Sequence, residues 1–242
     1  KANMLFIVQD PYTSYYDAKV VRDFVALTQK LGFSPILLPF KPNGKAMHIK
    51  GFLARFSKTA KTQAEFLNRV AKLNVPLVGV DSAIVLSYRD EYKEALGDSR
   101  GNFHVLTAHE WLTNQLESNT LQSAVKNIAK SDRTFEWHLF PHCAESTFMP
   151  NSPKEWQHIF AQFGQTLNVE RVGCCGMAGV FGHEVQNQTM SKDIYDVSWG
   201  KKLQGKDPNH CLATGYSCRS QVKRYEKAIL KHPVQALLEI LN

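Results

Sequence analysis

The residues best suited to chemistry in this chain are its five cysteines, and all of them lie in the second half: Cys143, Cys174, Cys175, Cys211 and Cys218. An odd number of cysteines, two of them adjacent, is a poor framework for disulfide bonds. Four thiolates are the usual ligands of an iron–sulfur cluster or a structural zinc ion. Free cysteine is also a common core residue, which is the plain alternative. We therefore expect thiol or metal chemistry in a reducing, cytoplasmic compartment.

Glycines recur around the adjacent pair of cysteines. The segment Gly-Cys-Cys-Gly-Met-Ala-Gly-Val-Phe-Gly has a glycine at every third position, including Gly173, Gly176 and Gly179. Glycine lets the backbone approach a bulky group and present amide N–H donors to it. Sulfide and thiolate accept such hydrogen bonds. The pattern therefore predicts a cofactor beside these glycines, and it matches neither common nucleotide-binding fingerprint.

Histidines near the cysteines offer a second kind of chemistry. His142 directly precedes Cys143, and His183 follows the glycine-rich segment. Either could bind or hydrogen-bond a cluster. Either could instead activate a thiol as a nucleophile, which requires the ring to lie beside a thiol of low pKa. A histidine in a polar loop or in the core is the plain alternative.

The elements that must position these residues are read from hydrophobic periodicity. Short apolar runs alternate with amphipathic helical patterns, which predicts parallel sheets built from right-handed crossovers. Strands are predicted over residues 5–8, 35–40, 76–80, 103–106, 137–140, 169–175 and 210–216, and helices over residues 18–31, 64–73, 110–116, 153–163, 221–230 and 234–241. Cys143, Cys174, Cys175 and Cys218 then lie at or just past strand ends, where sites gather in parallel sheets. We expect these four thiols to converge, with Cys211 outside.

The order of elements restarts halfway along the chain. We predict an α/β fold of two similar parallel-sheet, Rossmann-like subdomains related by pseudo-twofold symmetry, over residues 1–116 and 133–242. A shift of 133 residues places four residues of the first half at the positions of the four thiols: Asp10, Lys41, Pro42 and Val85. These side chains cannot together hold iron or zinc. The cysteine-free half is therefore expected to be free of metal.

Charge and hydropathy narrow the range of partners. The formal net charge is +7, but no nucleic-acid motif accompanies it, so no nucleic-acid partner is expected. No apolar run is long enough to span a membrane. Residues 41–61 carry several basic side chains and no acid, which predicts either a solvated helix face or docking of an acidic partner. The chain opens at Lys1 directly into an apolar run, so we expect a piece of a longer polypeptide.

Cys143, the Cys174-Cys175-Gly176 triplet and Cys218 together resemble the cysteine-rich CCG domain. That domain occurs, usually in tandem, in the B subunit of heterodisulfide reductase and in iron–sulfur subunits of glycolate oxidase and anaerobic glycerol-3-phosphate dehydrogenase. Two stretches of sequence, one around the triplet and the other reading Ala-Thr-Gly-Tyr-Ser-Cys-Arg-Ser-Gln, extend this resemblance. They are similar to the C-terminal region of bacterial FAD-linked oxidase/ferredoxin fusion proteins of the D-2-hydroxyglutarate dehydrogenase type. The family's last element commonly reads Cys-x-x-Cys, whereas residues 215–218 keep only the final thiol.

The resemblance implies that Cys143, Cys174, Cys175 and Cys218 bind an iron–sulfur cluster, most simply [4Fe–4S]. It implies an electron-transfer domain that works with the FAD-binding and ferredoxin-type domains of a parent 2-hydroxy acid dehydrogenase and with an unknown acceptor. FAD belongs to the parent protein and not to this chain, which is not expected to oxidise the hydroxy acid by itself. A thiol-based redox or catalytic domain and a zinc-stabilised interaction module are the alternatives.

Overall fold

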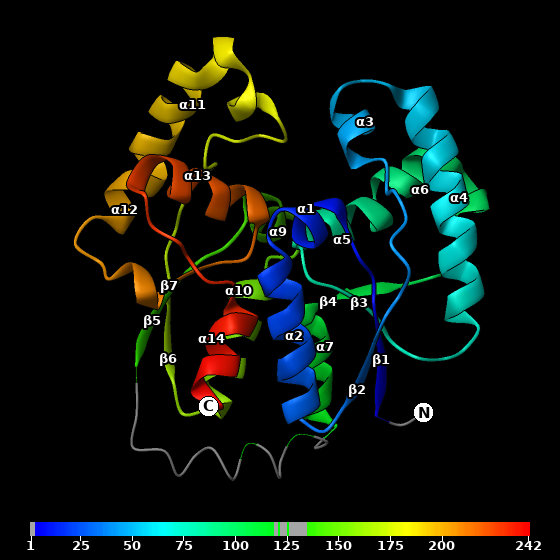
Figure 1. Ribbon diagram of the computed structural model, residues 1–242, viewed down its shortest axis with the longest axis horizontal. Coiled ribbons are helices and arrows are strands. Elements are labelled where there is room, and N and C mark those ends of the chain that lie inside the picture. Colours follow the sequence, from blue (N-terminus) through cyan, green and yellow to red (C-terminus); the bar gives the residue numbers. More distant parts are fainter. Residues whose placement is uncertain (1–2, 119–120, 122–124, 126–134) are drawn as a thin grey trace. The chain divides into compact units, whose positions relative to one another are not determined.

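Strands and helices alternate throughout the computed structural model, which describes residues 3–118, 121, 125 and 135–242. The chain divides into two compact units, Lys1–Trp111 and Leu112–Asn242. Each unit has its own parallel β-sheet with helices packed on it (Figure 1). The predicted α/β fold with two similar parallel-sheet subdomains is confirmed. The pseudo-twofold relation between them stays a prediction.

The sheet of the first unit contains four parallel strands in the order β2-β1-β3-β4. They are β1 (Met4–Ile7), β2 (Ser34–Leu37), β3 (Leu77–Gly79) and β4 (Val105–Thr107). Met4 lies opposite Ser34, and Phe6 lies opposite Leu77. The first strand is therefore central, and the chain crosses to either side of it, which leaves a switch point between β1 and β3.

Helices of the first unit follow the strands with short connections. They are α1 (Pro11–Tyr15), α2 (Ala18–Lys30), α3 (Lys45–Ile49), α4 (Leu53–Ala71), α5 (Ser82–Arg89), α6 (Glu91–Leu96) and the 3₁₀ turn η1 (Gly97–Arg100). The helix α7 (Ala108–Glu117) begins in the first unit and continues past its last residue, Trp111. The helix predicted over 64–73 begins eleven residues earlier, at Leu53. Its first turns bury Phe56 and Ala60 among basic residues, so their apolar periodicity is weak.

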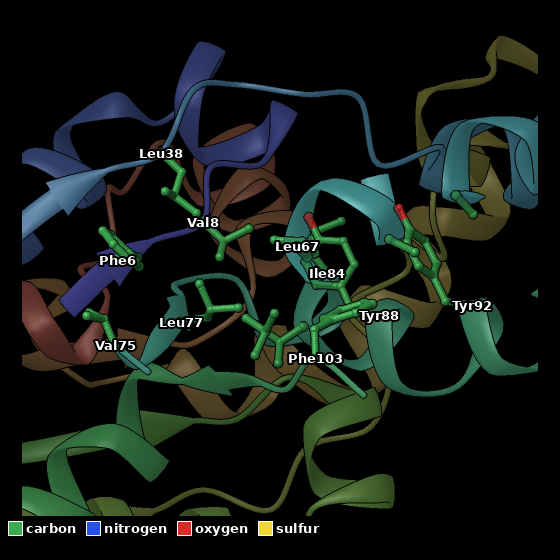
Figure 2. Packing of buried hydrophobic residues seen from close by; sticks show 14 of the residues in the cluster. Phe6, Val8, Leu38, Leu67, Val75, Leu77, Ile84, Tyr88, Tyr92 and Phe103 are labelled. Carbon is green, nitrogen blue, oxygen red and sulfur yellow. The ribbon is translucent and has the colours of Figure 1, made fainter. Parts of the chain in front are cut away.

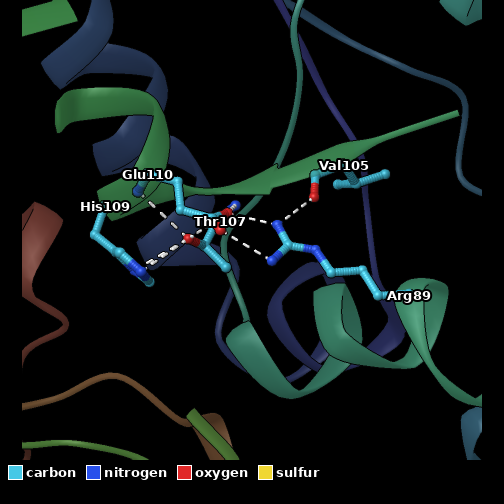
Figure 3. A network of polar contacts seen from close by, with 5 residues as sticks. All are labelled: Arg89, Val105, Thr107, His109 and Glu110. Carbon is cyan, nitrogen blue, oxygen red and sulfur yellow. Dashed lines mark hydrogen bonds and ion pairs between the residues drawn. The ribbon is translucent and has the colours of Figure 1, made fainter. Parts of the chain in front are cut away.

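The core of the first unit lies between the sheet and helices α4 and α5. Phe6 and Leu77 of the strands pack with Leu67, Tyr88 and Phe103 (Figure 2). A network of polar contacts also stabilises the first unit, and it joins α5, β4 and α7. Arg89 donates hydrogen bonds to the carboxylate of Glu110 and to the carbonyl oxygen of Val105 (Figure 3).

Glu110 is held as a carboxylate by this network. Burial opposes its ionisation, but the hydrogen bonds from Arg89 and from the amide of Thr107 outweigh burial and lower its pKa to about 2. The ion pair therefore persists over the ordinary pH range and anchors α7 to the end of α5.

The second unit has three parallel strands in the order β6-β5-β7. They are β5 (Glu136–Phe140), β6 (Thr166–Val169) and β7 (Cys211–Ala213). Trp137 lies opposite Leu167, and Leu139 lies opposite Leu212. The order repeats that of β2-β1-β3 in the first unit.

Helices of the second unit are α9 (Cys143–Phe148), α10 (Ser152–Gln162), α11 (Gln188–Tyr195), the π-helical turn η4 (Asp196–Gly200), α12 (Lys201–Leu203), α13 (Tyr216–Glu226) and α14 (Pro233–Ile240). Short 3₁₀ turns lie between them: η2 (Phe181–His183), η3 (Val185–Asn187) and η5 (Pro208–His210). Among the helices described in either unit, none combines the length and the apolar character needed to cross a bilayer.

Two details of the sequence interpretation were wrong. The strand predicted over 169–175 is β6, which ends at Val169, so both adjacent cysteines lie in a loop. The amide of Gly173 donates to the Ser198 hydroxyl at 2.7 Å and not to a neighbouring strand, which explains the early end. The single shift of 133 residues also fails for the third strands. It relates Phe6 to Leu139, whereas their partners Leu77 and Leu212 differ by 135.

Candidate functional site: a cluster of four thiols

Three separate segments of the second unit carry the candidate thiols to the carboxyl edge of its sheet. Cys143 is the first residue of α9, directly after β5. Cys174 and Cys175 lie in the loop that follows β6, and Cys218 lies in the first turn of α13, after β7. Each segment leaves a different parallel strand at the same end, so the chain topology brings the thiols to one place.

The thiols are in contact with one another. Cys174 is hydrogen-bonded to Cys143 and to Cys175, and Cys175 is also hydrogen-bonded to Cys218. The structure thus brings together the four cysteines that the sequence singled out. Cys211 is elsewhere: it is fully buried in β7, and burial raises the pKa of its thiol to about 11. We refer to Cys143, Cys174, Cys175 and Cys218 as the thiol cluster.

The hydrogen bonds of the thiol cluster favour the thiolate form of Cys174. Its sulfur accepts hydrogen bonds from the thiols of Cys143 and Cys175 and from the backbone amides of Gly176 and Ala178, which lowers its pKa to about 2 against the opposing effect of burial. The Gly176 nitrogen lies 3.3 Å from this sulfur. Because Cys143 and Cys175 donate to Cys174, and because they are buried, their own pKa values are raised. The site therefore stabilises one thiolate among protonated neighbours.

The backbone after Cys175 has an unusual conformation that supplies these amide donors. Gly176 and Gly179 have φ values of +83° and +72°, and Ala178 has a φ of +40° although it carries a Cβ. The N–H groups of Gly176 and Ala178 in this turn both point to the Cys174 sulfur, and a concavity lined by backbone N–H groups is a known way to hold an anion. The strained Ala178 within this turn is typical of a functional loop.

Buried polar residues that the sequence did not single out hold this loop in place. Ser191 of α11 donates to the Gly176 carbonyl oxygen at 2.7 Å. Gln221 of α13 donates to the Cys175 carbonyl oxygen at 3.0 Å and to the Ser191 hydroxyl at 2.8 Å. Gly173 is fixed to η4, because the ring nitrogen of Trp199 donates to its carbonyl oxygen at 3.1 Å. Gly173 thus supports the loop, while Gly176 provides a donor to sulfur.

The two candidate histidines have different positions. His142 caps α9: its Nδ1 accepts the amide N–H of Ala144 at 3.2 Å, and its own amide donates to the Thr214 hydroxyl at 2.9 Å. It also packs so closely on Gly215 that a Cβ there would lie 2.3 Å from the ring. His183 is exposed at the end of η2. His142 is therefore a structural neighbour of the thiol cluster, and His183 is a surface residue.

The thiol cluster lies at the boundary between core and solvent. Cys175 and Cys218 are buried in an apolar cluster with Phe140, Met177 and Trp199. Cys143 and Cys174 are only half-buried. In residues 3–118 and 135–242, no group of three or more His, Cys, Asp or Glu side chains is arranged to hold a metal ion. The thiols instead touch in pairs, as a hydrogen-bonded chain.

Together, the two units define an α/β protein with parallel sheets of matching strand order and a thiol cluster at the edge of the second sheet. The chain is 80% identical over 242 residues to D-2-hydroxyglutarate dehydrogenase of Haemophilus influenzae and 58% identical over 242 residues to that of Escherichia coli. It is 23% identical over 241 residues to the C subunit of anaerobic glycerol-3-phosphate dehydrogenase of E. coli.

These alignments cover 100%, 100% and 95% of this chain, respectively. The chain spans only 24% and 23% of the length of the two D-2-hydroxyglutarate dehydrogenases, and 57% of the length of the glycerol-3-phosphate dehydrogenase polypeptide. No family model matches the chain. It is therefore similar to one part of larger proteins named as dehydrogenases, about a quarter of the length of the two D-2-hydroxyglutarate dehydrogenases.

Proposed function

We propose that the second unit binds an iron–sulfur cluster, most simply [4Fe–4S], and that the chain is the electron-transfer part of a larger FAD-dependent 2-hydroxy acid dehydrogenase. The observation that carries this proposal is the thiol cluster itself, in which four sulfurs from three segments meet and two backbone amides stabilise the negative charge of Cys174. Homology to dehydrogenases supports the oxidoreductase context.

The donor set fits such a group in its chemistry. Iron–sulfur clusters are held by cysteine thiolates, and hydrogen bonds to sulfur tune their reduction potential. A bound cluster would supply a site that accepts and releases one electron. The sulfurs must separate from their present contacts to bind it, and the half-buried Cys143 and Cys174 have solvent on one side into which they can move. The amides of Gly176 and Ala178 would then keep donating to Cys174.

The remaining parts of the proposal follow from the chain's organisation. Residues 1–116 and 133–242 would be two CCG-type repeats, of which only the second binds metal. The FAD-binding and ferredoxin-type domains would belong to the rest of the parent polypeptide, and the electron acceptor is unidentified. D-2-Hydroxyglutarate, which the names of the relatives specify, is the proposed substrate of the parent, and it would be oxidised at the flavin.

Thiol catalysis by a cysteine–histidine pair is less well supported. The hydrogen-bond partners found for Cys174 are other thiols and backbone amides. His142 uses its Nδ1 in a helix cap, and His183 is exposed. A structural zinc ion remains compatible with four sulfurs and is therefore a separate arm of the test.

The proposal is tested by anaerobic reconstitution of the reduced chain, with iron and sulfide in one sample and Zn²⁺ in another. We expect the first sample to acquire a broad visible absorption that dithionite bleaches, together with an EPR signal in one redox state. Stoichiometric zinc binding without an iron–sulfide chromophore would instead support a zinc module. Binding of neither metal would contradict both.

A further inference from the structure

A second polar concavity lies in the first unit, next to the amino end of β4. A cavity of about 620 Å³ opens among α5, α6, η1 and the segment leading into β4. Its charged and titratable lining consists of Arg89, Lys93, Asp98, Arg100 and His104. This volume is within the usual range for small-molecule sites. The thiol cluster is in the other unit, so the cavity requires its own explanation.

The positive charge of this cavity is only partly balanced. The guanidinium of Arg89 is paired with Glu110, as Figure 3 shows. The nitrogens of Arg100 donate to three backbone carbonyl oxygens, and in the part of the chain that the structure describes no carboxylate lies within ion-pair distance of it. A guanidinium has five N–H donors, so two of those on Arg100 remain after these bonds. Arg100 and Lys93 together outweigh Asp98, which is the one acid in the lining.

Arg100 is also held rigidly. The carbonyl oxygens of Tyr88, Gly101 and Phe103 accept hydrogen bonds from its guanidinium at 2.7, 2.9 and 3.1 Å, and its Cζ atom lies 4.2 Å from the centroid of the Phe103 ring. Asn68 of α4 fixes the backbone on either side by donating to the Arg100 carbonyl oxygen at 2.8 Å and accepting the Phe103 amide at 3.2 Å. A cation that is already ordered loses little entropy when an anion binds.

Burial of the cationic groups provides independent support. Partial burial, followed by the neighbouring charge of Arg89, lowers the pKa of Arg100. The same two causes, in the same order, lower the pKa of His104. The positively charged forms of these side chains are therefore destabilised by burial and by mutual repulsion. A bound anion would lower the free energy of the charged forms.

We propose that this cavity binds a small organic dianion whose charge is carried by phosphate or carboxylate oxygens. The fixed guanidinium of Arg100 would supply paired N–H donors, which match the geometry of either group. Lys93, which is exposed at the rim, would contribute a mobile second charge. Asp98 would oppose binding.

The test is isothermal titration calorimetry of the complete chain with phenyl phosphate and with succinate, at an ionic strength kept constant with sodium chloride. We expect Lys93→Gln to weaken binding about tenfold, which corresponds to about 1.4 kcal/mol. We expect Asp98→Asn to tighten binding several-fold. Lys61→Gln, which removes the same charge from an exposed position on α4 outside the cavity, should leave binding unchanged. Arg100 is retained in every variant because it supports the backbone.

Opposite effects of the Lys93 and Asp98 substitutions would support the cavity as the binding site. Binding of one probe only would assign the ligand to the phosphate or to the carboxylate class. The proposal would be overturned if neither probe bound at millimolar concentration. It would also be overturned if binding were the same in both variants as in the unsubstituted chain.

Discussion

The carboxyl edges of the two sheets have the same topology but different chemistry. In the first unit, Asp10 follows β1 and caps α1, and Asp81 follows β3 and caps α5. In the second unit, the equivalent cap positions are His142 before α9 and Gly215 before α13. The strands that deliver these residues have the same order in both sheets.

The two edges differ in the functional groups that the first turns of their helices carry and in what those groups contact. The Asp10 carboxylate accepts hydrogen bonds from the amides of Tyr12 and Thr13 and from the Thr13 hydroxyl, so it serves the helix it caps. In the second unit the first position of α9 is a thiol, Cys143, where α1 has Pro11. The prediction that Asp10 takes the position of Cys143 is therefore wrong by one residue, because Asp10 is a cap and corresponds to His142. The second edge thus gains its thiols at two kinds of position: the first turns of α9 and α13 carry Cys143 and Cys218, and the loop after β6 adds Cys174 and Cys175.

The most severe way to disrupt the second edge is to replace Gly176 by alanine. A Cβ at this position would lie 2.1 Å from the backbone oxygen of Ser191, and the φ of +83° adds strain. We expect a loss of about 2–5 kcal/mol in the free energy of unfolding, measured by urea titration, because an unfavourable φ costs about 1–2 kcal/mol and overpacking about 1–3 kcal/mol more.

Two alanine variants serve as controls for that loss. Gly205→Ala has a similar φ and open space around it, so it should cost only about 1 kcal/mol. Gly44→Ala, in the loop after β2, meets the ring of Phe56 and should have an intermediate effect. Equal losses in all three variants would show that Ser191 does not constrain the cysteine loop.

Removing the charge of Asp10 should change how stability depends on pH. Burial, followed by the nearby Asp81, raises the pKa of Asp10 to about 6 from its ordinary 3.8. The folded state therefore binds this proton more tightly than the unfolded state does. The resulting stability is fully present below about pH 4 and is lost as the pH rises through about 6.

We therefore expect the unsubstituted chain to lose up to about 3 kcal/mol between pH 4 and pH 7 from this group, and Asp10→Asn not to lose it. Asparagine keeps an oxygen that can cap the helix. Urea titrations across this pH range measure the difference, and Asp98→Asn, an exposed carboxylate of the same unit, is the control. A stability difference between Asp10→Asn and the parent chain that is constant with pH would contradict this account.

A smaller effect is expected for Ser191→Ala. The variant loses a donor to Gly176 and the acceptor that Gln221 uses, and both are buried. We predict a loss of about 2 kcal/mol in the free energy of unfolding. Ser57→Ala in the first unit removes a single hydrogen bond of 3.5 Å and should cost much less. If the two serine variants were equally stable, the buried network would not support the loop.

The smallest effect concerns the basic segment of the first unit. Lys45 forms an ion pair with Glu91, and Lys41 lies 5.1 Å from the ring centroid of Phe66. These lysines therefore have partners within their own unit, which weakens the docking interpretation of residues 41–61.

We expect Lys45→Gln to lower the free energy of unfolding by less than about 1 kcal/mol, and we expect this loss to shrink at high salt. Lys58→Gln, exposed on α4, is the matched control. A large loss that did not respond to salt would contradict this.

Much of the fold could be predicted from periodicity because each amphipathic helix buries one regular stripe. Val20, Phe24 and Leu27 of α2 are such a stripe, and all three are buried. The segment from α11 to η4 was missed although Ser191, Tyr195 and Trp199 follow helical spacing and are buried. One of these is a serine and the segment has few other apolar residues, so its pattern is weak.

The sequence indicated which thiols form the candidate site, but it did not indicate the buried polar residues that hold the cysteine loop in place. Each candidate cysteine follows a strand of a parallel sheet, so convergence followed from topology alone. The contacts of Gln221 with the Cys175 carbonyl oxygen and with Ser191 join helices and a loop that are far apart in sequence. Polar residues on helices usually face solvent, so a glutamine such as Gln221 is not expected in the core.

The central claim is that four thiols of the second unit act as one metal-binding set and that Cys211 does not belong to it. The most direct test is the iron and acid-labile sulfide content per chain after anaerobic reconstitution, compared between Cys174→Ser and Cys211→Ser. We predict that Cys174→Ser loses most of the bound iron and sulfide, while Cys211→Ser retains the content of the unsubstituted chain. Equal retention in both variants, or equal loss in both, would contradict the claim.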